Sequence, residues 1–469
     1  MTLRIIGPID SQNHSFTYDG HGRITGIIDQ AGNLSNVVTN FNTLADIPPG
    51  FVGTAAVGFD TFIGDGISFI PSSIKSGAVK FHGNLATLKE QYRTLANAIR
   101  ATLNGTANTR ILLNGDSTTL GSGELSTLQV PNSYVHRAAE IINKRIVKGG
   151  WQSNYGSIVG GPTFTFSTQD TRLLDYPAGW STFDLGTVGN NTNKGRSIGG
   201  SLAYNNTTTN PITFTPSAVT DTLDVYYVDV GAGYNTFSVK VGGVQIGALA
   251  APTGSASIKK LSVSTGVAAA LNTYTIQREV TGTGAMIVGF EAYNSAEKEI
   301  TFVNAGCGGT FIDTNLAQTT TATYYTALKM LTDATSTVKF NAVCINFGIN
   351  HWLNSTAQTA VNFESSLNYA VSTLVTAGIP VVLFIPPKSG LTVGSPLVTD
   401  AIMQGYVDAI YRTATTYSLA VIDIYSKFGS NATAKTLGYM HTDNVHITNV
   451  GYSKIASYFA DFINYLVTD

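Results

Sequence analysis

The sequence predicts an α/β fold built on a five-stranded parallel sheet. Five short apolar runs rich in β-branched residues are the first indication, and they lie at 110–113, 300–303, 342–345, 381–385 and 420–424. Runs that are apolar throughout suit strands covered on both faces. Apolar residues at helical spacing occur before the first run, over 85–103, and at the C-terminus, over 455–466. Strands that alternate with helices are typical of a parallel sheet.

The alternation of strand and helix stops between about residues 149 and 299. Short alternating stretches replace it, for example at 221–228, 236–241 and 274–280. This pattern predicts a β-sandwich inserted into the α/β domain. The expected domain map is an N-terminal β or attachment region at 1–80, an α/β domain at 81–159 and 299–469, and an inserted β-sandwich at 160–298.

Composition excludes several classes of partner. The formal net charge is −2 and only 12% of the 469 residues are charged, so no broad basic field exists to bind nucleic acid. No window approaches the roughly 20 apolar residues of a membrane span. The N-terminus turns polar before an apolar stretch of signal-peptide length has formed, so we expect no signal peptide. The histidines and cysteines lack the spacing of a metal site, so we expect no metal and no cofactor.

A serine follows the first predicted strand of the sheet. The segment 112–118 reads Leu-Leu-Asn-Gly-Asp-Ser-Thr and places Ser117 just past the strand end. Ligands of open α/β sheets gather at the carboxyl ends of the strands. The same residues also occur in ordinary turns. Position after a strand therefore favours a nucleophile without proving one.

A carboxylate and a histidine precede the last predicted helix. Asp443 and His446 are separated by three positions on a short loop. A serine hydroxyl needs a base to take its proton, and the base needs a carboxylate to fix its tautomer. The alternative is a surface Asp and His at the entry to a helix.

Two further loops could supply donors to an oxyanion. A glycine-rich segment, 304–310, follows the second predicted strand in the chain, and Asn350 follows the third. Acyl transfer needs N–H groups aimed at the developing negative charge. A flexible turn and an Asx-turn explain the same residues equally well when each is taken alone.

Together the four segments resemble the SGNH (GDSL-like) hydrolase superfamily, whose serine, glycine, asparagine and histidine follow in this order. The resemblance covers about 105–160 and 300–469. It implies a flavodoxin-like three-layer fold with Ser117 as nucleophile and Asp443 and His446 as its charge-relay partners. The implied oxyanion donors are N–H groups of Ser117, Gly309 and Asn350.

Within the resemblance, Gly309 is preferred to Gly308 as a donor because it is the fifth residue after Asn304, as in the family. The chain departs from the family at two points. Gly-Asp-Ser is followed by Thr118 in place of leucine, and His351 stands where aspartate is usual after the asparagine. Neither departure removes a residue that the mechanism uses.

The polar N-terminal segment, the inserted β region and the Tyr- and Gly-rich composition also resemble those of bacteriophage tail spike proteins that carry an SGNH esterase. That resemblance implies a homotrimeric virion protein, attached to the tail through its N-terminal region, which removes O-acetyl groups from capsular polysaccharide or O-antigen on the host surface. Trp352, His351 and His441 are the side chains expected to contact this substrate. Two alternatives stay open: a non-catalytic glycan-binding receptor module on the same scaffold, and a lipid or short-chain esterase.

Overall fold

The computed structural model describes most of the α/β segments, 81–159 and 299–469, and separate strands elsewhere. The described residues are 15–18, 24–28, 34–36, 59–63, 68–71, 77–123, 132–143, 149–151, 174–175, 181–183, 202–205, 209–216, 219–229, 236–250, 257–279, 285–306, 308–317, 327–332, 339–390 and 398–468.

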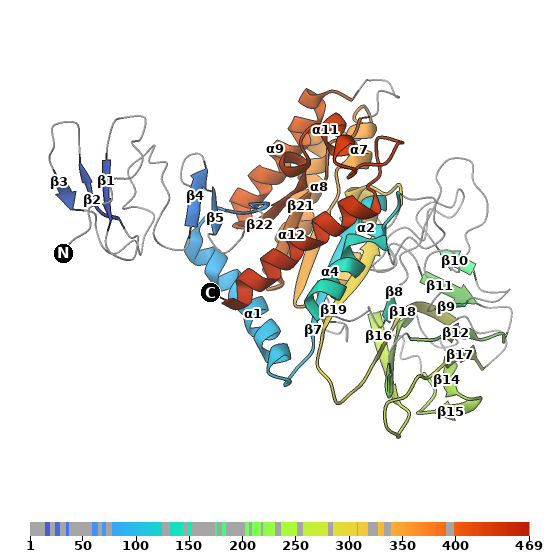
Figure 1. The fold of residues 1–469 in the computed structure, drawn as a ribbon. Helices are drawn as coiled ribbons and strands as arrows, with labels where there is room; N and C mark the ends of the chain where they lie inside the picture. The colour runs from blue at the N-terminus through green and yellow to red at the C-terminus, as the bar shows by residue number, and fades with distance from the viewer. Residues whose placement is uncertain are drawn as a thin grey trace.

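A single large sheet forms the centre of the molecule (Figure 1). Its strand order is β19-β7-β20-β21-β22-β6-β5-β4. The first five strands run parallel, and the last three are antiparallel to their neighbours. The bounds of the eight strands, in sheet order, are Ile300–Gly306, Thr109–Gly115, Ala342–Asn346, Val381–Ile385, Ala420–Asp423, Val79–His82, Ser68–Pro71 and Phe59–Ile63.

Helices cover both faces of this sheet and complete three layers. One face packs against α1 (Leu85–Leu103), α4 (Tyr134–Asn143) and α12 (Asn449–Thr468) through one apolar cluster. The other face packs against α8 (Ala360–Thr376) and α9 (Asp400–Tyr417) through a second cluster. The parallel strands are buried along their length, which explains why their sequences are apolar without alternation.

The five predicted parallel strands are all present, but the sheet is larger than predicted. β6, β5 and β4 extend it to eight strands among the described residues. The predicted boundary at residue 80 is therefore wrong in detail, because it divides strands that hydrogen-bond to one another. The patterning of 59–82 gave no sign of this, since these antiparallel strands are short and do not alternate with helices as the parallel strands do. The separate three-stranded sheet of β1 (Ser15–Tyr18), β2 (Ile24–Ile28) and β3 (Leu34–Asn36) does lie within 1–80.

The predicted insertion contains two antiparallel sheets, and no helix occurs among its described residues. One sheet has the order β10-β11-β18-β13-β16, with β8 also paired to β18, and the other has the order β15-β14-β17-β12-β9. Both sheets contribute to one apolar cluster, which includes Phe214, Phe237, Tyr274 and Phe290. β8 precedes residue 160, so the insertion begins earlier than predicted. The bounds of these strands are Gly149–Trp151 (β8), Leu174–Asp175 (β9), Ser181–Phe183 (β10), Leu202–Asn205 (β11), Ile212–Phe214 (β12), Thr222–Asp229 (β13), Phe237–Val241 (β14), Val244–Ile246 (β15), Ser257–Ser264 (β16), Tyr274–Arg278 (β17) and Ala285–Tyr293 (β18).

A buried group of charges joins the insertion to the central sheet. Arg110 of β7 contacts Glu291 of β18 at 2.7 Å and Asp224 of β13 at 3.4 Å. Thr301 of β19 donates to the same glutamate at 3.1 Å. Tyr226 of β13 donates to Glu291 at 2.8 Å and belongs to the apolar cluster under α8 and α9. The antiparallel sheet that contains β13 and β18 thus shares side-chain contacts with the parallel sheet.

Candidate active site

Ser117 lies where β7 passes into the short helix α2 (Ser117–Leu120). The turn requires glycine at 115, because a Cβ there would lie 2.2 Å from Thr119 Oγ1 and 2.5 Å from the Asn346 carbonyl oxygen. Asp116 caps the helix by accepting the Thr118 N–H at 2.9 Å. Ser117 is therefore the first helical residue, where a backbone N–H has no acceptor within the helix.

His446 and Asp443 reach this serine from the loop before α12. His446 Nε2 lies 3.1 Å from Ser117 Oγ, and His446 Nδ1 lies 2.6 Å from Asp443 Oδ2. The second carboxylate oxygen accepts the backbone N–H groups of Val445 and His446, both at 2.9 Å. The loop thus orients the carboxylate with its own backbone and leaves one oxygen for the imidazole. Three residues separated by up to 329 positions form one continuous hydrogen-bonded line.

The electrostatics of this line suit a base held by a carboxylate. Partial burial opposes ionisation of Asp443, but hydrogen bonds from His446 and Val445 outweigh it and hold the pKa of the carboxyl well below its usual range. The carboxylate is therefore ionised at neutral pH and favours the tautomer with a proton on Nδ1. Nε2 is then free to accept the Ser117 proton.

The comparisons with known proteins place this geometry on a known fold. No protein-family model matches the chain, and neither does any curated protein. Among solved structures, the chain is similar to a peptidoglycan O-acetylesterase at 18% identity and a TM-score of 0.58, over 83% of this chain and 99% of that one. The two proteins share a fold. Because the α/β segments make up little more than half of the chain, the match also takes in part of the remaining segments.

Two other matches cover much less of the chain. A lipase/acylhydrolase from Enterococcus faecalis matches 36% of this chain and 77% of its own, at 21% identity and a TM-score of 0.29. An acetyl xylan esterase matches 35% of this chain and 81% of its own, at 19% identity and a TM-score of 0.27.

The predicted oxyanion loops lie beside the serine at the same edge of the sheet. β19 and β20 are the two neighbours of β7, with Gly306 and Asn346 both in register with Gly115. Gly309 adopts φ +68°, a left-handed conformation that favours glycine. Asn350 Nδ2 donates to the Thr310 carbonyl at 3.0 Å and so links the two loops. Gly308, Gly309 and Asn350 therefore follow the strands that flank the serine, while their role as donors stays a prediction.

Two of the three predicted substrate contacts are wrong. Trp352 and His351 are fully buried, so neither side chain can touch a bound sugar in this structure. Both side chains instead anchor the short helix α7 (Ile349–Leu353). His351 Nε2 accepts the Ile312 N–H at 3.2 Å, and Trp352 Nε1 donates to Ser389 Oγ at 3.1 Å. Sequence proximity to Asn350 suggested the site, but alternate residues of a helical turn face opposite ways.

His441 does lie next to the predicted catalytic loop. Its Nδ1 is 3.7 Å from Asp443 Oδ2 and accepts the Asp443 N–H at 3.4 Å. Its own N–H donates to the His446 carbonyl at 2.8 Å. With a quarter of its side chain exposed, His441 remains a predicted substrate contact.

Asp116 and Asn304 are two buried polar residues that support the turn at Ser117. Burial raises the pKa of Asp116 to about 6, against the opposing effect of hydrogen bonds from Thr118 and the nearby His446. Asn304 Nδ2 donates to the Thr119 carbonyl at 3.0 Å and to Ser133 Oγ at 3.1 Å, which fixes α2 against β19. The role of Asn304 could have been predicted from its place at a strand end, because a buried asparagine there needs hydrogen-bond partners.

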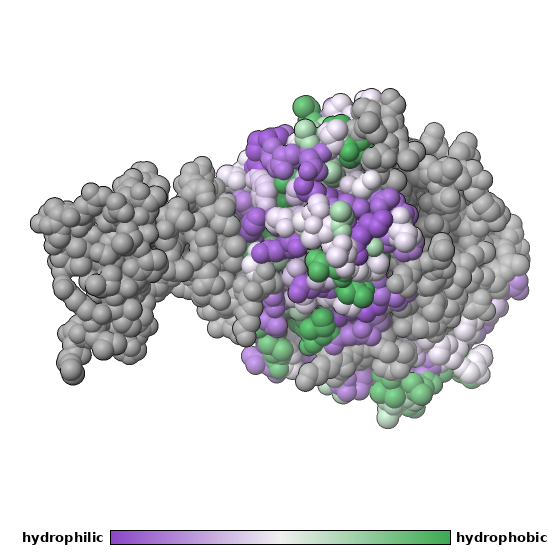
Figure 2. Space-filling view, turned by 45° about the horizontal axis from the view of Figure 1, so that its top comes forward, coloured by the Kyte–Doolittle hydropathy of each residue, from purple (hydrophilic) through white to green (hydrophobic). Residues whose placement is uncertain are grey.

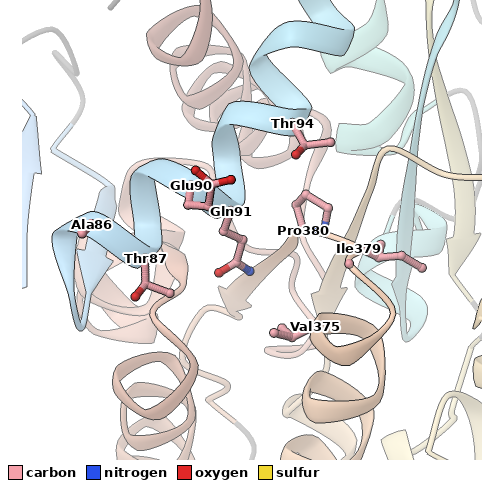
Figure 3. Close-up of a pocket in the computed structure, with 9 residues that line it drawn as sticks. Ala86, Thr87, Glu90, Gln91, Thr94, Val375, Ile379 and Pro380 are labelled. Carbon is pink, nitrogen blue, oxygen red and sulfur yellow. The ribbon is translucent and has the colours of Figure 1, made fainter.

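The cavity in Figure 3 lies away from this site. It measures about 500 Å³ and is lined by residues of α1, including Thr87, Gln91 and Thr94, and by the turn before β21, including Ile379 and Pro380. Pro380 precedes the start of β21, so the cavity lies at the amino edge of the sheet, whereas Ser117 lies at the carboxyl edge. Its lining includes neither a histidine nor a serine.

Within the described ranges, no three His, Cys, Asp or Glu side chains gather closely enough to hold a metal ion. Among the same residues, no helix combines the length and apolar character needed to cross a membrane.

Proposed function

We propose that the chain is a serine esterase that works by two-step acyl transfer. The observation that carries the proposal is the hydrogen-bonded line from Ser117 Oγ through His446 to Asp443. His446 Nε2 takes the serine proton while Oγ attacks the ester carbonyl carbon. The C–O bond to the alcohol breaks, and the imidazolium gives its proton to the leaving oxygen. Water, deprotonated by His446, then releases the acid and the free serine.

The oxyanion of each tetrahedral intermediate would be held by N–H groups of Ser117, Gly309 and Asn350. Support comes from their position on three adjacent strand ends and from the Asn350–Thr310 hydrogen bond, which fixes the distance between two of the loops. For the asparagine to donate to the oxyanion, its Nδ2 must use the hydrogen that does not reach Thr310.

The proposed substrate is an O-acetylated bacterial surface polysaccharide, such as a capsule or O-antigen. Similarity over most of the chain to a protein named as a peptidoglycan O-acetylesterase supports an acetylated glycan. On the face drawn in Figure 2, hydrophilic and hydrophobic residues of the described part of the chain are interspersed. Such a surface suits a sugar better than a lipid, which favours a contiguous apolar approach.

The wider proposal is a homotrimeric phage tail spike. In it, the N-terminal region would attach to the tail, and the inserted β-sandwich, 160–298, would hold the polysaccharide. Support comes from the polar N-terminal segment, the Tyr- and Gly-rich composition and the all-β character of the described insertion. Sedimentation or light scattering of the purified chain tests the trimer: a monomer at micromolar concentration would contradict it.

The reaction is tested by hydrolysis of aryl esters from acetate to decanoate. Acetate should be the best substrate, with a steep loss beyond about four carbons, since each further methylene needs apolar space worth roughly 0.8 kcal/mol. Ser117→Ala should remove at least about 10³-fold of the turnover, because the nucleophile is lost. A preference for long chains would favour the lipid esterase, and wild-type protein that binds glycan without turnover would favour the receptor module.

The substrate is tested separately by NMR of O-acetylated capsule or O-antigen incubated with the protein. The acetyl signals should decrease as free acetate appears, and they should persist with the Ser117→Ala variant. Hydrolysis of aryl acetate with unchanged polysaccharide signals would retain the esterase and exclude this substrate.

A further inference from the structure

The loop that carries Asp443 and His446 is held by contacts of Asn444, the first of the two residues between them. Asn444 adopts φ +65°, a left-handed conformation that asparagine tolerates. Its carbonyl oxygen accepts the Gly390 N–H at 2.8 Å and the Asn431 side-chain N–H at 3.3 Å. Its side-chain oxygen accepts Lys435 Nζ at 2.7 Å. The orientation of the peptide between Asn444 and Val445 is thus set by contacts outside its own loop.

The segment 388–390, which follows β21, is the other partner in these contacts. Asn431 Nδ2 donates to the Lys388 carbonyl at 3.1 Å as well as to Asn444, so one amide group holds both segments. The packing is close: a Cβ at Gly390 would lie 2.3 Å from Asn431 Oδ1 and 3.1 Å from Asn444 Cβ.

The same segment is fastened to the helix that carries Asn350. Trp352 Nε1 donates to Ser389 Oγ at 3.1 Å, and both side chains are buried. The indole also packs between Tyr406 of α9 and Tyr425 of α10 (Ile424–Phe428), with ring centroids 6.3 and 6.5 Å away. Asn350 and Trp352 belong to one short helix, so a shift of the indole moves the asparagine with it.

We propose that Trp352 and Asn431 are positioning residues that act through 388–390, a strut joining the Asn350 helix to the Asp443–His446 loop. This inference rests on the proposed function. The strut would set the position of the base relative to one oxyanion donor. The chain supplies these two groups from separate strand ends. Small errors in such placement are costly, since reacting groups must hold their geometry within about 1 Å.

The test begins with Trp352→Phe, which keeps a buried ring but removes the N–H donor, and with Ser389→Ala, which removes its acceptor. Each variant should lower kcat on aryl acetate about tenfold, with KM nearly unchanged, because a buried partner is left unsatisfied and the helix can shift. The double variant should lose no more than either single one, because both changes break the same hydrogen bond. Asn431→Ala should lower kcat similarly.

The matched control is Thr102→Val, which removes a buried hydroxyl hydrogen bond of 2.7 Å to Thr109, the first residue of β7 and thus at the opposite edge of the sheet. It should lower the melting temperature but leave kcat unchanged. If the Trp352 and Asn431 variants likewise changed only the melting temperature, their role would be structural and the proposal would be overturned.

A second readout does not depend on turnover. Hydrogen exchange of the peptide that contains Val445 and His446, whose N–H groups bond to Asp443, should quicken in Trp352→Phe and Asn431→Ala but not in Thr102→Val. Unchanged exchange in the two folded variants would overturn the strut. Faster exchange in a protein whose wild type hydrolyses no ester would keep the strut and reject the proposed function.

Discussion

Two groups of titratable side chains lie at opposite ends of β7. One contacts a serine hydroxyl, and the other joins strands of two sheets. At the carboxyl end, Asp443 and His446 keep 39% and 29% of their side chains exposed, and they lead to a serine hydroxyl. At the amino end, Arg110 and Glu291 keep only 16% and 3%, and they lead to other protein groups. A carboxylate and its partner can thus support chemistry where the partner faces a reactive group and solvent, and they support cohesion where all their partners are buried protein groups.

The hydrogen bonds that Glu291 accepts explain why the group around Arg110 is structural. Arg110 donates to Oε2 at 2.8 Å through Nε, Tyr226 donates to the same oxygen, and Thr301 donates to Oε1. Burial opposes the charge on Arg110, but Glu291, Tyr226 and Asp224 outweigh it, so the pKa of the guanidinium lies above its ordinary value. A guanidinium stays charged near neutral pH, so Arg110 has no proton to exchange there.

The largest difference between the two groups should appear on replacing Asp443 with asparagine. The amide can keep an oxygen toward the N–H groups of Val445 and His446, so the loop should stay folded. Its NH₂ would then face Nδ1 and favour the wrong imidazole tautomer, which should lower kcat by about 10⁴-fold. Turnover and a pH–rate profile equal to those of the parent would show that another carboxylate serves His446.

The converse change is Glu291→Ala, which should cost stability and spare catalysis. Removing one partner of a buried ion pair leaves Arg110 undercompensated and should lower the free energy of unfolding by about 3–5 kcal/mol. Chemical denaturation measures this change, and kcat on aryl acetate should stay close to the parent value.

The control for Glu291 is Glu364→Ala. Glu364 pairs with Arg412 at 2.7 Å, but the arginine side chain is 58% exposed. Its loss should cost less than about 1 kcal/mol. Equal costs for Glu291 and Glu364 would contradict the distinction drawn between a buried and an exposed pair.

A smaller effect is expected at Asp116, which is buried like Glu291 but lies next to the nucleophile. Its pKa is raised to about 6 in the folded chain, so its contribution to stability is complete below the unfolded pKa of about 3.8 and is lost as pH rises through 6. From pH 4 to pH 8, Asp116→Asn should therefore gain about 2 kcal/mol of stability relative to the parent. A difference in stability that does not vary with pH would show that Asp116 is already ionised at low pH.

The parallel strands and the contact between Asp443 and His446 could be predicted from the sequence because both follow chain-local rules, whereas the pairing of His446 with Ser117, 329 positions away, was implied only by the family resemblance. A buried parallel strand is apolar throughout, as in β21, and an Asp-x-x-His spacing can close on itself within one loop. The antiparallel strands β4 to β6 and the start of the insertion at β8 follow no such rule. Their place depends on partners far along the chain: β6 pairs with β22, and β8 pairs with β18.

The wrong predictions at Trp352 and His351 have the same origin. Each lies next to Asn350 in sequence, but burial is decided by the helices that pack over α7, including Phe363 of α8 and Tyr406 of α9 around His351. The Arg110–Glu291 pair was equally invisible, because its members are 181 positions apart on strands of different sheets.

The central claim, that Ser117 is activated by His446 and Asp443, is tested most directly by labelling with a fluorophosphonate, which reacts with an activated serine by loss of fluoride. Intact-mass measurement and peptide mapping should find a single adduct on Ser117 in the parent. The Ser117→Ala variant should form none, Asp443→Asn should react far more slowly, and folded Glu291→Ala should react at the parent rate. An adduct on another residue, or none on a folded parent chain, would contradict the account.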